Sequence, residues 1–305
     1  MSSVATTDRD QLHVEASGKL RLHPLSIPLA LGLFAFVPTF FRASLAWLNN
    51  LDYSHGFVVP VFAAWLVWCR KQELHSAFEQ RHSKWETSIG VVTLLAALIL
   101  LVGATFARVV AAEVFAFVVA AWGFVLIAGG LSMVRVVWPA TTSLFFMIPL
   151  PGLLIDPLRE QLQSCSTSIS VFLLQLFGVA AERTGMVIQL TTSQIGVAEA
   201  CSGLRILVSL LAVIFAVAVL VNRPLIEKLL LGLTAIPIAI LINSVRIALV
   251  AATVQYAPAW EATVHQIAGL TMILLAIALV SLQLRYTSSL FEVESEQGRR
   301  NGRSF

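Results

Sequence analysis

The chain has very little charge. Of its 305 residues only 12% are Asp, Glu, Lys or Arg, about half the fraction of a typical soluble domain. So few charged side chains cannot cover a surface that faces water on all sides, which excludes a soluble globular fold. Cysteine is also scarce: Cys69, Cys165 and Cys201 are too few and too scattered for a disulfide framework or a zinc site. The net charge of +3 reflects membrane topology rather than a nucleic-acid partner.

Long apolar runs dominate what is present. Hydrophobic residues make up 58% of the chain and the mean hydropathy is +0.85, while a membrane-spanning helix needs roughly 20 apolar residues. We predict an all-α, polytopic membrane protein with about eight transmembrane helices. No cleaved signal, internal repeat or soluble domain is expected. The eight candidate runs, of which the second is short, are 24–41, 57–69, 88–106, 109–131, 136–155, 204–221, 229–254 and 267–284.

The basic residues predict the orientation, because Lys and Arg concentrate in cytoplasmic loops. With the N-terminus inside, 14 of the 20 Lys and Arg residues fall in inner segments and six on the outer side or at span ends. Both termini are therefore predicted to be cytoplasmic. The polar ends suggest a cytoplasmic leader over 1–23, a transmembrane domain over 24–284 and a disordered cytoplasmic tail over 285–305.

The segment 156–181 is polar in its first half, and its apolar residues recur near helical spacing. This pattern is typical of an amphipathic helix on the outer leaflet, although a ninth span remains an alternative. The stretch after it, 182–200, contains the alternating sequence MVIQLTT, which suggests a short outer hairpin or loop.

Three reactive or charged residues share one membrane depth in this topology. Cys201 precedes the sixth span at its outer end, and His265 begins the eighth span at the same end. Arg246 lies 17 residues after Leu229, roughly 25 Å along a helix. An Arg within a span costs at least about 2.5–3.5 kcal/mol on insertion scales, so it normally faces a partner, a cavity or a pathway. Snorkelling to the outer interface is the alternative, and Asn243, one turn earlier, could anchor it.

The three residues form a coherent acyl-transfer set. A Cys201 thiolate would be the nucleophile, favoured by the start of a helix and by Arg205 four residues later, unless Arg205 instead holds a lipid phosphate. His265 could take the thiol proton and protonate a leaving amine. Arg246 could stabilise the oxyanion of the tetrahedral intermediate. The chemistry predicted is acyl transfer at a peptide bond, at the outer membrane surface.

The same residues resemble the exosortase/archaeosortase family. The resemblance extends from about residue 24 to residue 284, and the Cys motif with a downstream Arg and His is its most specific part. The strings that carry it are EACSGLR at 199–205, NSVRIALVA at 243–251, His265 with QIAG at 266–269, YSHGFVVP at 53–60 and IPLPGLL at 148–154.

The resemblance implies a bacterial inner-membrane cysteine transpeptidase. Its substrates would be membrane-anchored proteins with a tripartite C-terminal signal: a short motif such as Pro-Glu-Pro, a transmembrane helix and a basic end. It would pass the protein to an unknown lipid-linked or amine acceptor at the periplasmic face, in connection with exopolysaccharide export. The family's catalytic Cys, Arg and His map onto Cys201, Arg246 and His265. Membrane lipids are expected as partners; no cofactor, metal or nucleic acid is expected.

Other residues have weaker assignments. Tyr53 and His55 could line a substrate groove or hold a lipid headgroup. Glu199 could orient His265, pair with Arg205 or be solvated. The alternatives to a sorting enzyme are a transporter or a non-catalytic export factor that uses Arg246 as an anion site, and a protease that releases its product to water.

Overall fold

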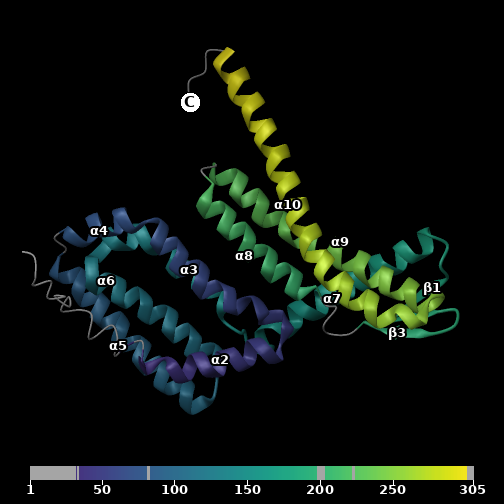
Figure 1. Ribbon diagram of the computed structural model, residues 1–305, viewed down its shortest axis with the longest axis horizontal. Coiled ribbons are helices and arrows are strands. Elements are labelled where there is room, and N and C mark those ends of the chain that lie inside the picture. The colour runs from purple at the N-terminus through teal and green to yellow at the C-terminus, as the bar shows by residue number, and fades with distance from the viewer. Residues whose placement is uncertain (1–31, 33, 81–82, 198–202, 222–223, 301–305) are drawn as a thin grey trace, which may run out of the picture. The chain divides into compact units, whose positions relative to one another are not determined.

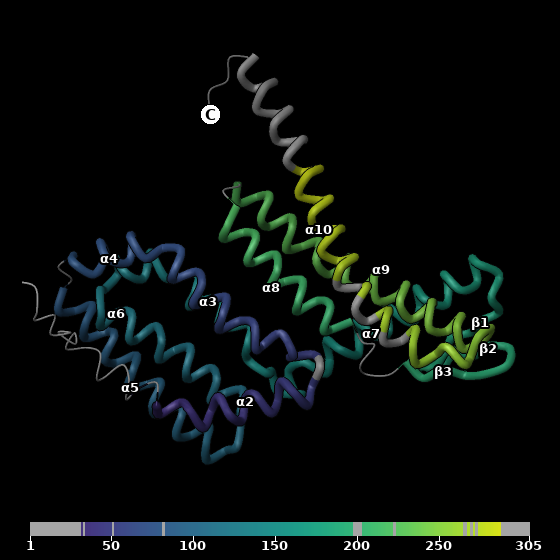
Figure 2. Tube along the Cα trace, viewed as in Figure 1, coloured from purple at the N-terminus to yellow at the C-terminus, as the bar shows by residue number. Residues whose placement is uncertain are grey.

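The structure, a computed structural model, describes residues 32, 34–80, 83–197, 203–221 and 224–300, and Figure 2 draws the residues of uncertain placement in grey. The predicted leader over 1–23 therefore lies outside the described residues, as do Glu199 and Cys201. For His265 the backbone is described and the side chain is not. The chain divides after Pro38 into a short N-terminal unit and a main body over 39–305, and the main body contains every site described below.

Nearly all of the described secondary structure is helical, which confirms the predicted fold class in its broad form (Figure 1). The α-helices are α2 (Val37–Asn49), α3 (Val58–Cys69), α4 (Lys71–Glu79), α5 (Lys84–Ala107), α6 (Val110–Ser143), α7 (Gly152–Leu176), α8 (Leu204–Leu220), α9 (Leu225–Tyr256) and α10 (Glu261–Arg300). The 3-10 helices are η1 (Leu51–Phe57), η2 (Leu144–Met147) and η4 (Pro258–Trp260).

Within the described residues, three helices are long and apolar enough to cross a membrane: Lys84–Ala107, Val110–Met147 and Leu225–Tyr256. Two shorter apolar helices are Leu204–Leu220 and Leu274–Thr287. Three described helices therefore have the length and hydropathy of a membrane span, two more are apolar but shorter, and the count of eight spans stays a prediction.

The long helix α6 is two helices joined by a tight turn. Gly129 and Gly130 leave the helical conformation, and Gly130 has φ 60° and ψ −153°, a region open essentially only to glycine. Residues of the first half, such as Val114 and Val118, share a hydrophobic cluster with Ala140 of the second half. The two halves therefore lie side by side, as the separate runs 109–131 and 136–155 predicted.

Helix α7 packs a face of mixed polarity against the protein, in which small polar residues are buried together with Ile155, Leu162, Val171 and Leu174. The small polar stripe Gln163, Ser166, Thr167 and Ser170 is buried, and the Ser170 hydroxyl donates to the Ser244 carbonyl of α9 at 2.9 Å. Of the apolar face predicted to lie on the outer leaflet, Leu158, Phe172 and Leu176 are exposed and Leu162 is buried; the position of α7 on the leaflet stays a prediction. Close helix packing through small polar residues, with apolar side chains facing outward, is characteristic of membrane proteins. Helix α7 is not among the helices apolar enough to span.

The hairpin predicted after α7 is present as a small antiparallel sheet, and its position on the outer side stays a prediction. Its order is β1-β2-β3, and β2 pairs with both neighbours. Ile188 is fully buried in a cluster with Leu174 of α7 and Ala251 of α9, so the sheet is fixed to the ends of these two helices (Figure 1). The strands are β1 (Ala181–Thr184), β2 (Val187–Leu190) and β3 (Gln194–Gly196).

Helices α9 and α10 run antiparallel, and polar pairs fix their register. The Thr287 hydroxyl donates to Glu227 at 2.9 Å, and the Thr234 hydroxyl donates to Gln283 at 2.9 Å. Helix α10 continues to Arg300, past the predicted domain boundary at residue 285. The division into leader, transmembrane domain and tail stays a prediction.

Candidate active site

The Cys201 motif ends against helix α9. Gly203 caps the start of α8 in the left-handed conformation, with φ +83°. A side-chain carbon placed on Gly203 would lie 3.2 Å from Cγ and from Nδ2 of Asn243. Glycine is thus needed here both for its backbone conformation and for the close approach of α9. Residue 203 and Asn243, which are 40 positions apart in sequence, are in direct contact.

Arg246 follows Asn243 by one turn and is buried inside the protein. Asn243 is completely buried, and only 6% of Arg246 is exposed. Its guanidinium therefore does not snorkel along lipid to the interface. The burial agrees with the expectation that an intramembrane Arg faces the protein interior.

Residue 265 lies in the first turns of α10, at a level close to Arg246. The pairs Thr234–Gln283 and Glu227–Thr287 set the register of the two helices. We extend this register along α9 and α10 with a helical rise of about 1.5 Å per residue. Measured along the helix axes, residue 265 then lies within about 5 to 9 Å of Arg246. The direction of the His265 side chain lies outside the described residues, so the convergence of Cys201, Arg246 and His265 stays a prediction.

A buried acid that no sequence pattern singled out lies beside the start of α8. Asp52 of η1 has 9% of its side chain exposed and forms ion pairs with two arginines. Its Oδ2 lies 3.5 Å from Nη2 of Arg159 on α7, and its Oδ1 lies 3.8 Å from Nε of Arg205 on α8. Arg159 also pairs with Asp156 at 2.6 Å. Arg205 is thus paired with Asp52. The pairing of Arg205 with Glu199 that the sequence suggested stays a prediction, because Glu199 lies outside the described residues.

The YSHG motif binds the backbone that connects α6 to α7. The Tyr53 hydroxyl donates to the Leu150 carbonyl at 3.1 Å, and His55 Nε2 donates to the Phe146 carbonyl at 2.9 Å. Trp47 of α2 adds a third bond, from its Nε1 to the Met147 carbonyl at 2.9 Å. These bonds hold the YSHG motif and the end of α2 against residues 146–150, which lead into the IPLPGLL segment about 90 residues later in the sequence.

Burial keeps both side chains of this motif neutral. It raises the pKa of the Tyr53 phenol, so the hydroxyl stays protonated and able to donate. It lowers the pKa of His55 below its ordinary value near 6.5. Because the Phe146 carbonyl only accepts, the neutral ring carries its proton on Nε2. These properties suit a fixed support better than a proton-transfer group.

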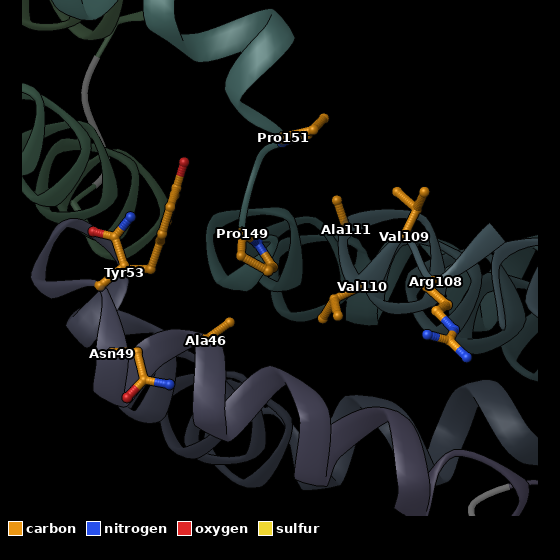
Figure 3. Close-up of a pocket in the computed structure, with 10 residues that line it drawn as sticks. Ala46, Asn49, Tyr53, Arg108, Val109, Val110, Ala111, Pro149 and Pro151 are labelled. Carbon is orange, nitrogen blue, oxygen red and sulfur yellow. The ribbon is translucent and has the colours of Figure 1, made fainter.

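Two clefts adjoin the motif. The larger, of about 460 Å³, lies between the end of α2 and the start of α6 and contains Tyr53, Asn49, Asn50 and Arg108 among its lining residues (Figure 3). The second, of about 300 Å³, is almost wholly apolar and is lined by His55 with residues of α3 and α8. Tyr53 and His55 thus each line a cavity, while their polar atoms bind the backbone; a role in binding a substrate or a lipid headgroup stays a prediction. The described residues contain no group of three or more His, Cys, Asp or Glu side chains arranged to hold a metal.

The fold and the buried charges define the class first: a helical membrane protein that buries charged side chains between its helices, among them Glu113, Glu227 and Arg246. A comparison with protein families then gives the particular family. The family model described as Transmembrane exosortase (Exosortase_EpsH) matches residues 47–282, and the chain belongs to this family. Neither the curated proteins nor the solved structures contain a match to the chain.

Proposed function

We propose that the chain is a membrane cysteine transpeptidase that cleaves C-terminal sorting signals, with Cys201 as its nucleophile. The observation that carries the proposal is the exosortase match over 47–282, which includes Cys201, Arg246 and His265. The substrates are membrane-anchored proteins that end in a short motif, a transmembrane helix and a basic cluster.

The contact between Gly203 and Asn243 supports a common site. Two residues of chain span at most about 7 Å, so Cys201 cannot lie farther than this from Gly203. Gly203 contacts the Asn243 side chain, and Arg246 is one turn farther along α9. The backbone of residue 265 lies within about two turns of the same level.

The chemistry then follows from the three side chains. The Cys201 thiolate attacks the carbonyl carbon of the scissile peptide, and Arg246 stabilises the negative charge that develops on its oxygen. The C–N bond breaks as His265 gives the leaving amine the proton it took from the thiol. The product is a thioester on Cys201. An acceptor amine or hydroxyl attacks the thioester, loses its proton to His265 and restores the free thiol; water in the same place gives hydrolysis.

The proposed location follows from the distribution of basic residues. Both termini lie in the cytoplasm, and the site faces the periplasm of a bacterial inner membrane, where exported proteins present their C-terminal signals. The acceptor is a lipid-linked group or an amine connected with exopolysaccharide export.

The test is the substitution of Cys201 by Ala and by Ser, in cells that express a protein with the tripartite signal. Both variants are expected to abolish processing, because a thiolate is required to form the thioester. The measurement is the ratio of precursor to product on immunoblots. Mass spectrometry of the new C-terminus distinguishes a transferred product from a hydrolysed one.

Cys165 provides a matched control, because it is an exposed free cysteine on α7. Cys165→Ala is expected to process the substrate at the normal rate. Unchanged processing in Cys201→Ala, at equal amounts of protein in the membrane, would show that the transpeptidase assignment is wrong.

A further inference from the structure

Asp52 lies where three elements meet: η1, α7 and α8. Its side chain is 9% exposed, and its carboxylate pairs with Arg159 at 3.5 Å and with Arg205 at 3.8 Å. Its backbone N–H donates to the Asn50 side chain at 3.0 Å, which fixes the start of η1. No motif in the sequence marked this residue.

A carboxylate this deeply buried is stable only with charged or hydrogen-bonding partners. Arg159 has a second acid, since Asp156 lies 2.6 Å from its Nη1 and is half exposed. Arg159 is thus shared between Asp52 and Asp156. The other carboxylate oxygen of Asp52 faces Arg205, the second residue of α8.

The segment that carries Asp52 is held firmly. Tyr53 and His55 bind the carbonyls of Leu150 and Phe146, so η1 cannot shift without breaking both hydrogen bonds. Arg205 follows Cys201 by four residues. A fixed carboxylate on η1 thus sets the position of a cation at the start of the helix that follows the proposed nucleophile.

We infer that Asp52 is a positioning residue of the active site: it holds the Arg205 guanidinium at the start of α8, two residues after Gly203. Asp52 itself does not touch the reacting atoms. The fixed positive charge of Arg205 favours the Cys201 thiolate. The inference rests on the proposed role of Cys201 and adds a residue that the chemistry of the Cys, Arg and His did not require.

The experiment uses the full-length chain in native membranes with Cys69→Ala and Cys165→Ala, which leaves Cys201 as the single thiol. In this background, Asp52→Asn, Asp52→Glu, Arg205→Gln and the double variant Asp52→Asn/Arg205→Gln are compared. Two rates are measured: processing of a tripartite-signal protein, and labelling of Cys201 by a maleimide at pH 7. Both are normalised to the amount of the chain in the membrane.

The expected result is a loss that depends on Arg205. Asp52→Asn and Arg205→Gln each lower both rates by about tenfold, because one partner of a buried charge pair is lost. The double variant should have processing and labelling rates less than about twofold below those of Arg205→Gln alone. Once Arg205 is lost, a residue that acts through Arg205 has no further effect. Asp52→Glu keeps most of both rates, since a longer carboxylate still reaches Arg205.

Glu113 supplies the matched control. It is a buried acid, 1% exposed, that pairs with Arg42 at 2.7 Å, on a different pair of helices. Any effect of Glu113→Gln is structural and is expected to multiply independently with that of Arg205→Gln.

Three outcomes would overturn the inference: unchanged rates in Asp52→Asn, faster labelling in that variant, or independent effects of Asp52→Asn and Arg205→Gln. Faster labelling would mean that Asp52 acts on the thiol as a bare negative charge. Failure of the proposed function looks different, because processing would then persist in Cys201→Ala while the effect of Asp52→Asn on thiol labelling could still be measured.

Discussion

Gly203, in the Cys201 motif, packs so close to α9 that a side chain at this position would be crowded. Its φ of +83° lies in the left-handed region, which costs other residues roughly 1–2 kcal/mol. In addition, a Cβ at this position would be 3.2 Å from two atoms of Asn243. A side chain at position 203 would therefore both strain the backbone of the Cys201 motif and press on Asn243 of α9.

Substitution of Gly203 by Ala is expected to lower the processing rate by about tenfold or more, because displacements well below 1 Å already impair a catalytic site. The free energy of unfolding should fall by about 1–2 kcal/mol from the backbone strain. The measurements are processing in cells and the thermal unfolding temperature in detergent.

Substitution of Gly185 by Ala is a control that introduces backbone strain without a close contact. Gly185 lies in the turn between β1 and β2 and also has a positive φ, +65°, but a Cβ added there would meet no atom within 4 Å. Gly185→Ala should therefore show the loss of stability with normal processing. Normal processing in Gly203→Ala as well would mean that its contact with Asn243 has no part in the site.

At the scale of single residues, the sequence pointed to the buried Arg246 but not to the buried Asp52. Arg246 was conspicuous because it interrupts an apolar run, and its burial agrees with that reading. Asp52 was missed because it stands in a polar segment next to the YSHG motif, where a carboxylate is unremarkable. Only the tertiary structure brings Arg159 and Arg205, more than 100 residues later, to its two oxygens.

At the scale of elements, the turn inside α6 is the clearest case of a local sequence that determines topology. The pair Gly129–Gly130 lets the chain reverse between two apolar helices. The Val114 and Ala140 sides of the two halves then share one cluster. A continuous helix through these residues would separate the two halves.

Gly130→Ala is expected to destabilise the protein by about 1–3 kcal/mol, because φ 60° and ψ −153° form a conformation that only glycine adopts without strain. The unfolding temperature in detergent and the yield in the membrane should both fall. Gly103→Ala in α5 is the control: it meets no atom within 4 Å and should be neutral or slightly stabilising. Equal stability of the two variants would contradict the assigned turn.

Helix α7 shows why a periodic pattern alone is not enough. The apolar spacing correctly predicted a helix, but Leu162 of its apolar face is buried while Leu158, Phe172 and Leu176 are exposed. Ser166 and Ser170 are buried where α9 approaches, because small residues allow close helix packing, and Gln163 is buried with its side chain donating to the Val197 carbonyl. In a membrane, an apolar stripe is as stable outside as inside, so its direction cannot be inferred from hydrophobicity.

At the scale of the whole molecule, the orientation in the membrane is the main prediction. Cys69 and Cys165 are both exposed free cysteines, and the topology assigns them to opposite faces. In a Cys201→Ala background, a membrane-impermeant maleimide applied to intact spheroplasts should label the chain that retains only Cys165. The chain that retains only Cys69 should be labelled only after the membrane is opened. Labelling of Cys69 in intact spheroplasts would invert the proposed topology.

The sequence by itself determined the membrane class, the helical fold, the family motifs and the candidate catalytic residues, because each of these depends on local composition or spacing. A chain with so few charged residues cannot have a surface that faces water on all sides, and an Arg within an apolar run can be recognised from the sequence alone. Only the tertiary structure decided which charges meet. Asp52, Arg159 and Arg205 lie on three different elements, and a buried ion pair is specified by packing rather than by sequence distance.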